Sequence, residues 1–320
     1  MTQTAPAEQP FVGAYALLDG LDEDAETAAY RALRELPVAG LELPLSRTEQ
    51  ADRWFGRNVT DAWDLVVTCI PTVMQRLTAD PGYGLASTRA EGLAAALADV
   101  TAAAAFARRL ADVAGRPRVR AIQIHSAPRR ETSSREAFAR SLDAIEGLDA
   151  AGAVMAVEHC DAARPGRPFH KGFLELADEV AALAGRSPRL GVTVNWGRSA
   201  IEGRSAAAPL EHVRSALAAG RLVGLMFSGT TGRPSPWGEL WDDGHMAPRG
   251  PAAALQASAD SLLGPAEVAE LVGLAQDAHP YLGVKVTVRP RDADLAHRLA
   301  VARAALGQLS AGVRAPSRAG

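Results

Sequence analysis

The sequence has 320 residues, of which 48% are hydrophobic and 22% are charged, and its formal net charge is −3. This composition excludes a disordered chain, and the interspersed charges provide no basic surface for nucleic acid. No apolar run reaches the ~18 to 20 residues of a membrane-spanning helix, and the N-terminus has no signal-peptide core. We therefore expect a soluble, cytoplasmic protein with no membrane partner, in which Cys69 and Cys160 are buried as free thiols.

Short runs rich in Val, Ile and Leu alternate with Ala-rich segments along the chain, which predicts repeated strand and helix units. The eight predicted strands lie in the runs FVGAYALL from Phe11, AGLELPL from Ala39, WDLVVTCIP from Trp63, VRAIQIHSA from Val119, VMAVEHC from Val154, LGVTVNW from Leu190, LVGLMFS from Leu222 and YLGVKVTV from Tyr281. Predicted helices between and after them include 23–36, 88–114, 134–148, 173–184, 209–219, 265–276 and 292–309.

This alternation predicts an α/β fold, a single (β/α)8 TIM barrel over residues 10–312 with disordered tails at 1–9 and 313–320. An open, doubly wound parallel sheet is the main alternative. No glycine-rich phosphate-binding motif follows any predicted strand, so no nucleotide cofactor is expected.

Polar and titratable residues follow most of the predicted strands. In a (β/α)8 barrel the C-terminal strand ends form the active-site mouth, whereas the strand interiors are buried. The residues in such places are Tyr15, Glu42, His125, Ser126, Glu158, His159, Asn195, Ser228 and Lys285. Taken alone, each residue also has a purely structural explanation. Glu42 could form an ion pair with an arginine at the edge of the sheet, and His125 could be a hydrogen-bonded histidine of the core. Their convergence at one end of the barrel is what favours a functional site.

Two loops add candidates for substrate contact. The segment NWGRSAIEGRS, residues 195–205, supplies Asn195, Arg198 and Glu202, and its arginines can hold a carboxylate or phosphate or simply pair with acidic neighbours. The long irregular segment 229–252 contains Trp237, Trp241 and His245. Loops of this length often act as lids, so we expect it to close over the mouth; a subunit contact, which allows a homodimer, is the alternative.

The motifs HSAPR, VEHCD, NWGRSAIEGR, GLMFSG, GHM and YLGVKV follow one another in this order along the chain. This set resembles an uncharacterised actinobacterial family, a domain of unknown function, over nearly the whole length. That family is in turn similar to the xylose isomerase-like TIM barrels. The resemblance implies the barrel fold, carbohydrate metabolism and a site at the C-terminal strand ends.

The similarity to the xylose isomerase-like barrels also implies a divalent metal, Mn, Mg or Zn, held by residues at the ends of the fifth to eighth strands. Carried over by position, its ligands are Glu158, Asn195 where an aspartate or histidine is usual, and a displaced His245. Lys285 stands where the last glutamate is expected, and an ammonium group repels a cation. The resemblance thus predicts where the site lies and leaves metal binding open.

The residues themselves favour a sugar isomerase or epimerase that moves a proton next to a carbonyl group of a small carbohydrate or hydroxy-carbonyl substrate. In this hypothesis Glu158 is the base, His125 or His159 shuttles the second proton, and Lys285 stabilises the oxyanion in place of a metal. The expected substrate contacts are Glu42, Asn195, Arg198, Glu202, Trp237, Trp241 and His245. Two alternatives remain: a glycoside hydrolase with Glu42 and Glu158 as paired carboxylates, and a carbohydrate-binding barrel without catalysis.

Overall fold

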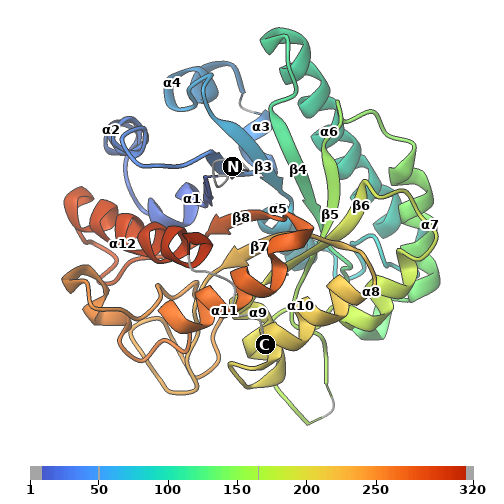
Figure 1. The fold of residues 1–320 in the computed structure, drawn as a ribbon. Coiled ribbons are helices and arrows are strands. Elements are labelled where there is room, and N and C mark those ends of the chain that lie inside the picture. Colours follow the sequence, from blue (N-terminus) through green and yellow to red (C-terminus); the bar gives the residue numbers. More distant parts are fainter. Residues whose placement is uncertain (1–8, 50, 165, 315–320) are drawn as a thin grey trace, which may run out of the picture.

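Eight parallel strands close into a barrel in the order β1 to β8, with helices arranged around them (Figure 1). The structure is a computed structural model that describes residues 9–49, 51–164 and 166–314. Pairing of Phe11 in β1 with Gly283 in β8 completes the closure and confirms the predicted barrel over an open sheet. The strands are β1 (Phe11–Val12), β2 (Gly40–Pro44), β3 (Asp64–Thr68), β4 (Val119–Ile124), β5 (Val154–His159), β6 (Leu190–Asn195), β7 (Leu222–Phe227) and β8 (Tyr281–Val284).

The helices form the outer layer. They are α1 (Ala14–Leu17), α2 (Glu23–Leu33), α3 (Leu45–Glu49), α4 (Gly56–Asn58), α5 (Ile70–Ala79), α6 (Ala90–Ala114), α7 (Arg135–Glu146), α8 (Leu176–Ala182), α9 (Trp196–Gly203), α10 (Ala208–Ala218), α11 (Pro265–Ala275) and α12 (Leu295–Arg314). Short π- or 3₁₀-helical turns are η1 (Ala51–Phe55), η2 (Arg130–Thr132), η3 (Ala253–Ser258) and η4 (Gln276–Ala278).

Two features differ from the boundaries expected from the sequence. The predicted first strand, FVGAYALL, is a strand only over Phe11–Val12; the Gly13 amide donates to the Val284 carbonyl, and Ala14–Leu17 then forms α1. Ala and Leu are strong helix formers, so this apolar run fits either structure. At the other end, α12 continues to Arg314, into the expected tail; residues 1–8 and 315–320 lie outside the described residues.

The inside of the barrel is filled by a small cluster of side chains from six strands: Phe11, Val66, Ala121, Ala156, Met226 and Tyr281. The Tyr281 hydroxyl on β8 is 3.1 Å from Gln123 Nε2 on β4 and 2.6 Å from Thr193 Oγ1 on β6. These strands are not neighbours of β8, so both contacts cross the interior. Because side chains alternate along a strand, every second residue from this cluster also faces inward.

The helix α6 is long and apolar enough to cross a membrane by length and composition alone. In the structure it packs against β4 and α7 as part of the outer ring, and its buried residues include Val100, Ala103 and Phe106. A core helix of a soluble barrel passes the same test, so this feature is weak support for a membrane span.

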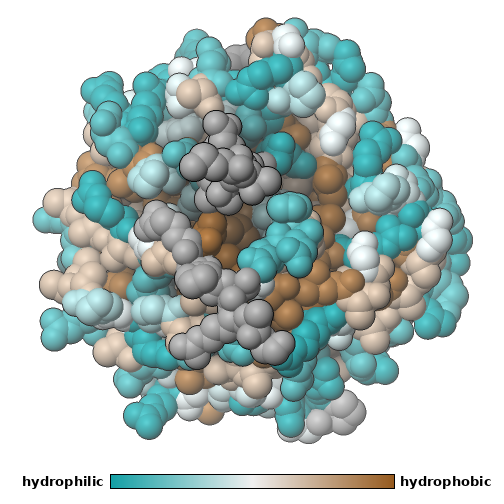
Figure 2. Space-filling model, in the orientation of Figure 1, coloured by the Kyte–Doolittle hydropathy of each residue, from teal (hydrophilic) through white to brown (hydrophobic). Residues whose placement is uncertain are grey.

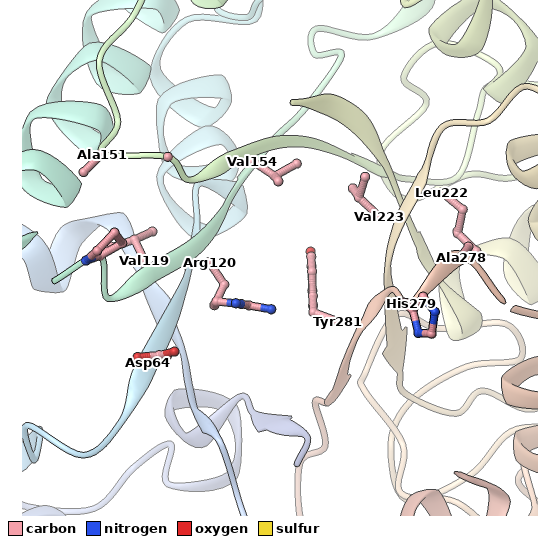
Figure 3. A pocket seen from close by; sticks show the side chains of 12 residues that line it. Asp64, Val119, Arg120, Ala151, Val154, Leu222, Val223, Ala278, His279 and Tyr281 are labelled. Atoms are coloured by element: carbon pink, nitrogen blue, oxygen red, sulfur yellow. The ribbon is translucent and has the colours of Figure 1, made fainter. Parts of the chain in front are cut away.

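A cavity of about 410 Å³ lies at the N-terminal end of the strands. The first residues of five strands line it, namely Asp64, Val119, Val154, Leu222 and Tyr281. Figure 3 shows the side chains of Arg120 and Tyr281 pointing into the space between these strands. On the face shown in Figure 2, hydrophilic side chains dominate the outline and hydrophobic ones gather towards the middle. The candidate catalytic residues follow the strands at the opposite end, so they do not line this cavity.

The close approach of β2 and β3 yields a prediction about stability. A Cβ atom at Gly40 would overlap the backbone carbonyl of Asp64, its partner on β3, whereas nothing lies within 4 Å of a Cβ at Gly273 in α11. We expect Gly40→Ala to lower the free energy of unfolding by at least about 2 kcal/mol. The control Gly273→Ala should raise it by about 0.5 to 1 kcal/mol. Urea unfolding of both variants tests this; equal stabilities would contradict the packing.

Candidate active site

Polar side chains converge inside the barrel at the C-terminal strand ends. Ala121 and Ala156 belong to the interior cluster, so His125, four residues after the first, and Glu158, two after the second, face inward. The same alternation makes five further side chains face inward. They are Glu42 on β2, Thr68 on β3, Asn195 on β6, Ser228 after β7 and Lys285 after β8. All these side chains are buried. The predicted convergence of Glu42, His125, Glu158, Asn195 and Lys285 is therefore present in the structure.

Glu158 is the centre of the first group. Its Oε2 atom is 2.7 Å from Arg198 Nη1 and 2.9 Å from His125 Nε2, and its Oε1 atom accepts a hydrogen bond of 3.1 Å from Asn195 Nδ2. Burial alone would raise the pKa of Glu158, but Arg198, Lys285 and His125 hold it well below its ordinary value. Burial lowers the pKa of His125, although Glu158 opposes the shift. Near neutral pH the glutamate is therefore ionised and the imidazole is neutral.

The side of Glu158 next to β6 is fixed by a chain of hydrogen bonds. Asn195 ends β6 and caps α9, because its Oδ1 atom accepts from the Arg198 amide at 3.4 Å. Ser228 Oγ donates to the same oxygen at 3.0 Å, so the Asn195 NH2 group is directed at Glu158. The tight turn from β6 into α9 thus places both Asn195 and Arg198 on one carboxylate.

Glu42 and Lys285 form the second group, on the other side of the interior. Lys285 Nζ is 3.1 Å from Glu42 Oε1, with both side chains fully buried, and it lies 5.2 Å from the centre of the Tyr15 ring. Burial raises the pKa of Glu42; Lys285 opposes the rise and Glu158 adds to it. Burial would lower the pKa of Lys285, but Glu42 and its other neighbours raise it. A Cβ at Gly13 would lie 2.8 Å from Glu42 Oε2, so this pair needs a glycine beside it.

Several buried polar atoms at these inward positions make no hydrogen bond to another protein atom of the described chain. They are Glu42 Oε2, Thr68 Oγ1, Gln123 Oε1 and His125 Nδ1. Unpaired buried polar groups cost free energy and are uncommon in folded proteins. Because His125 Nε2 contacts the ionised Glu158, that nitrogen carries the proton and the unpaired Nδ1 offers a lone pair. The arrangement can therefore accept and donate several further hydrogen bonds to a polyhydroxy compound.

The loop after β7 covers this region through Asp243. Its Oδ2 atom is 3.3 Å from Arg198 Nε and 2.7 Å from Lys171 Nζ, and its side chain is 5% exposed. Burial would raise the pKa of Asp243, but Lys171 and Arg198 hold it well below its ordinary value. Asp243 thus ties the loop to the arginine that also binds Glu158.

His245 and the two tryptophans of the loop have different surroundings. His245 lies near Asp243, with 3.4 Å between Nδ1 and Oδ1, and burial lowers its pKa to about 3. Trp237 is buried, donates to Thr287 Oγ1 at 2.9 Å, and lies 5.3 Å from the Arg289 guanidinium. Trp241 stacks on Arg204 at 5.5 Å. Each indole ring thus lies against an arginine, and the contact of the two tryptophans with a sugar ring stays a prediction.

A cavity of about 260 Å³ borders this loop on the mouth side of the barrel. Its lining includes Trp237, Asp243, His245, Thr287 and Arg289. Asp243 therefore faces the cavity and the Arg198 ion pair at once.

His159 and Glu202 do not join Glu158, although the sequence suggested that they would. His159 is adjacent to Glu158 on β5 and therefore points to the opposite face, towards the helices. Its Nδ1 is 2.7 Å from Glu179 Oε2 and its Nε2 is 3.0 Å from Glu202 Oε2. Burial lowers the pKa of His159, but the two carboxylates outweigh this effect and raise it to about 10. We call His159, Glu179, Glu202 and the nearby His212 the outer cluster.

The residues implied as metal ligands do not fit a divalent cation at the mouth. Glu158 already contacts Arg198 and His125, and Asn195 presents its NH2 group, a donor, to this carboxylate. Lys285 adds a second positive charge inside the barrel. Two fixed cations would repel a metal ion, and of the three implied ligands only His245 keeps a buried side-chain atom, its Nδ1, without a hydrogen-bond partner in the described chain. The barrel interior therefore supplies its positive charge from side chains.

Sequence reasoning missed Asp243 as a central residue and left Tyr15 and Ser228 without a role. Asp243 meets Arg198 and Lys171 only because the loop folds back over the mouth, and no local pattern indicates such a contact. Tyr15 lies in α1, just after β1, and Ser228 directly follows β7, so their places next to strand ends already marked them as candidates.

Comparison with known proteins agrees with the fold. A solved D-tagatose 3-epimerase-like protein matches with a TM-score of 0.59 at 12% identity, covering 95% of this chain and 98% of that one. A xylose isomerase domain protein from Alicyclobacillus acidocaldarius matches with a TM-score of 0.58 at 15% identity, covering 97% and 100%. At these identities the likeness shows a xylose isomerase-like TIM barrel and no particular activity.

The sequence comparisons are more specific. An uncharacterized protein of Salmonella typhimurium strain LT2 is 33% identical over 302 residues, which are 91% of this chain and 93% of that protein. A family model described as "Domain of unknown function (DUF4862)" matches residues 11–301. The chain therefore belongs to the DUF4862 family.

Proposed function

We propose that this protein is a sugar isomerase or epimerase that acts on a small carbohydrate or hydroxy-carbonyl compound by proton transfer inside the barrel mouth. The observation that carries the proposal is the enclosed set of Glu158, Arg198, His125, Glu42 and Lys285, with buried polar atoms still free to bind a ligand. The solved structures of similar fold support it, since they include an epimerase-like protein and a xylose isomerase domain protein.

Glu158 is the proposed base. An ionised carboxylate can remove the acidic proton next to a carbonyl group, and a cation beside the oxygen stabilises the enediolate that forms. In this structure Arg198 and His125 both contact the carboxylate of Glu158. A substrate oxygen that takes over the Arg198 N–H groups would release the carboxylate and raise its basicity.

His125 and Lys285 complete the proposed chemistry. The free Nδ1 of neutral His125 can accept the proton of a substrate hydroxyl group and pass it to the neighbouring oxygen of the enediolate, while protonated Glu158 returns its own proton to carbon. Lys285, kept charged by Glu42, stabilises the negative oxygen without a proton transfer of its own. Asn195 and Arg198 orient the substrate, and His245 closes over it with the loop.

The two alternatives receive less support. A glycoside hydrolase needs two carboxylates flanking an open cleft, whereas Glu42 and Glu158 are fully buried and each contacts a cation. A binding barrel without catalysis does not require the opposite pKa shifts of Glu42 and Glu158. The cytoplasmic location and the homodimer expected from the sequence stay predictions.

Removing the proposed base should abolish most of the turnover. We expect Glu158→Gln, which keeps the shape of the side chain, to reduce kcat by about 10²-fold or more. Asp99→Asn is a matched control, because Asp99 is another buried carboxylate with an arginine partner, but it lies on α6 away from the mouth. Turnover is measured with whichever sugar a panel of aldoses and ketoses identifies as substrate. Similar kcat values for both variants would reject Glu158 as the base.

Arg198 should determine the acidic limb of the pH profile. Activity needs ionised Glu158, whose pKa Arg198 helps to hold well below its ordinary value, so wild-type kcat/KM should stay level as the pH falls through the weakly acidic range. Arg198→Gln removes this charge, raises the pKa of Glu158 and should move the acidic limb to higher pH. The control Arg249→Gln, at a half-buried pair with Glu267, should leave the profile unchanged. An unshifted limb in Arg198→Gln would show that another group controls it.

The loop 229–252 should open when Asp243 loses its charge. Asp243→Asn weakens the contacts with Arg198 and Lys171, so amide hydrogen exchange in 229–252 should become faster and kcat/KM should fall. The neighbouring Asp242→Asn removes a more exposed carboxylate and serves as the control. Bound substrate should slow exchange in the wild type. Protection that depends on protein concentration and not on ligand would instead identify a subunit contact.

A further inference from the structure

The outer cluster brings two imidazoles and a carboxylate together outside the barrel. His159 ends β5, Glu202 lies on α9 and His212 lies on α10. One ligand atom from each residue lies within 4.8 Å of the others, and the three side chains are between 0% and 13% exposed. Within the described residues this is a group of metal-binding side chains that shares no atom with the site around Glu158.

A hydrogen bond at Nδ1 holds each imidazole ring, and zinc would take the place of the proton that His159 Nε2 now shares with Glu202. His159 Nδ1 is 2.7 Å from Glu179 Oε2, and a carboxylate can only accept, so the proton lies on Nδ1 when the ring is neutral. His212 Nδ1 is 2.9 Å from Ser199 Oγ, which can accept in the same way. Histidines that bind metals commonly donate their other N–H to a carboxylate or similar acceptor, and this fixes the tautomer and the ring orientation.

The distances within the triad suit a tetrahedral ion. His159 Nε2 is 3.0 Å from Glu202 Oε2, and His212 Nε2 is 3.9 Å from Glu202 Oε1. Zinc bonds of ~2.0 to 2.2 Å at tetrahedral angles place neighbouring ligand atoms about 3.3 to 3.5 Å apart, between these two values. Small side-chain shifts would bring all three atoms to one ion.

We propose that His159, Glu202 and His212 bind one zinc ion through the two Nε2 atoms and the Glu202 carboxylate. Two imidazoles with one carboxylate suit zinc, whereas Mg²⁺ and Ca²⁺ prefer oxygen ligands alone. Such an ion would tie α9 and α10 to the end of β5 and would have one coordination position left open. It lies behind the barrel wall, on the face opposite to Glu158.

Arg164 competes for the same carboxylate. Its Nη2 atom is 2.5 Å from Glu202 Oε1, its side chain is 44% exposed, and the Ala162 amide donates to Oε2 at 3.0 Å. A guanidinium at Glu202 lowers the negative charge available to a metal. Zinc affinity should therefore rise when Arg164 is replaced by glutamine, an effect that a site elsewhere in the chain would not show.

The test is zinc binding by full-length protein that has been treated with chelator and dialysed. Titration calorimetry and metal analysis should show one zinc per chain, with thermal unfolding shifted to higher temperature by zinc. Glu202→Gln and His212→Gln should weaken binding at least about 100-fold, and Ser199→Ala about 10- to 100-fold. Arg164→Gln should bind more tightly. The controls Glu158→Gln and His297→Ala, on β5 and α12, should bind as the wild type does.

Each outcome decides the proposal. Less than stoichiometric zinc, or equal affinity in the wild type and in folded Glu202→Gln and His212→Gln, would overturn it and leave the outer cluster as a hydrogen-bonded network. Loss of zinc in Glu158→Gln with retention in Glu202→Gln would also overturn it, because the ion would then lie inside the barrel. Circular dichroism confirms that each variant is folded. The readout is metal binding, so it can fail or succeed independently of the proposed sugar chemistry.

Discussion

The alternation of side chains along each strand is the constraint on which both polar clusters depend. Glu158 and His159 are neighbours on β5, yet one points into the barrel and the other towards the helices. Glu158, in the interior, lies near the cations Arg198 and Lys285 and a neutral histidine, whereas His159, on the outside, contacts two carboxylates. One strand thus supplies the acid of one cluster and the imidazole of the other, and a register shift of one residue would destroy both.

Burying four charges inside the barrel requires that they be matched. An unpaired buried carboxylate or ammonium is strongly unfavourable, and even a buried ion pair often gains little over apolar residues of the same size. The pairs Glu158–Arg198 and Glu42–Lys285 therefore satisfy charges that stability alone does not require. Their place at the C-terminal strand ends, under a loop held by Asp243, fits a site whose charges serve a substrate.

Much of this was predictable from the sequence, and the remainder depends on long-range contacts. The apolar runs predicted eight strands and placed Glu42, His125, Glu158, Asn195 and Lys285 at their ends. The strand register determines which face of the sheet each side chain occupies. Because adjacent residues of a strand point to opposite faces, Glu158 and His159 could not both belong to the interior site. The contact of Asp243 with Arg198, 45 residues away, and the engagement of Trp241 by Arg204 arise from loop packing that no local pattern encodes.

The central claim is that the barrel moves a proton on carbon with side-chain cations in place of a metal. The most direct measurement is solvent deuterium incorporation, followed by NMR, into a panel of aldoses and ketoses incubated in D2O with protein treated with chelator. The account predicts exchange at the carbon next to the carbonyl group that persists without added metal. Exchange that appears only when a divalent metal is restored would contradict it, as would the absence of exchange in every sugar of the panel.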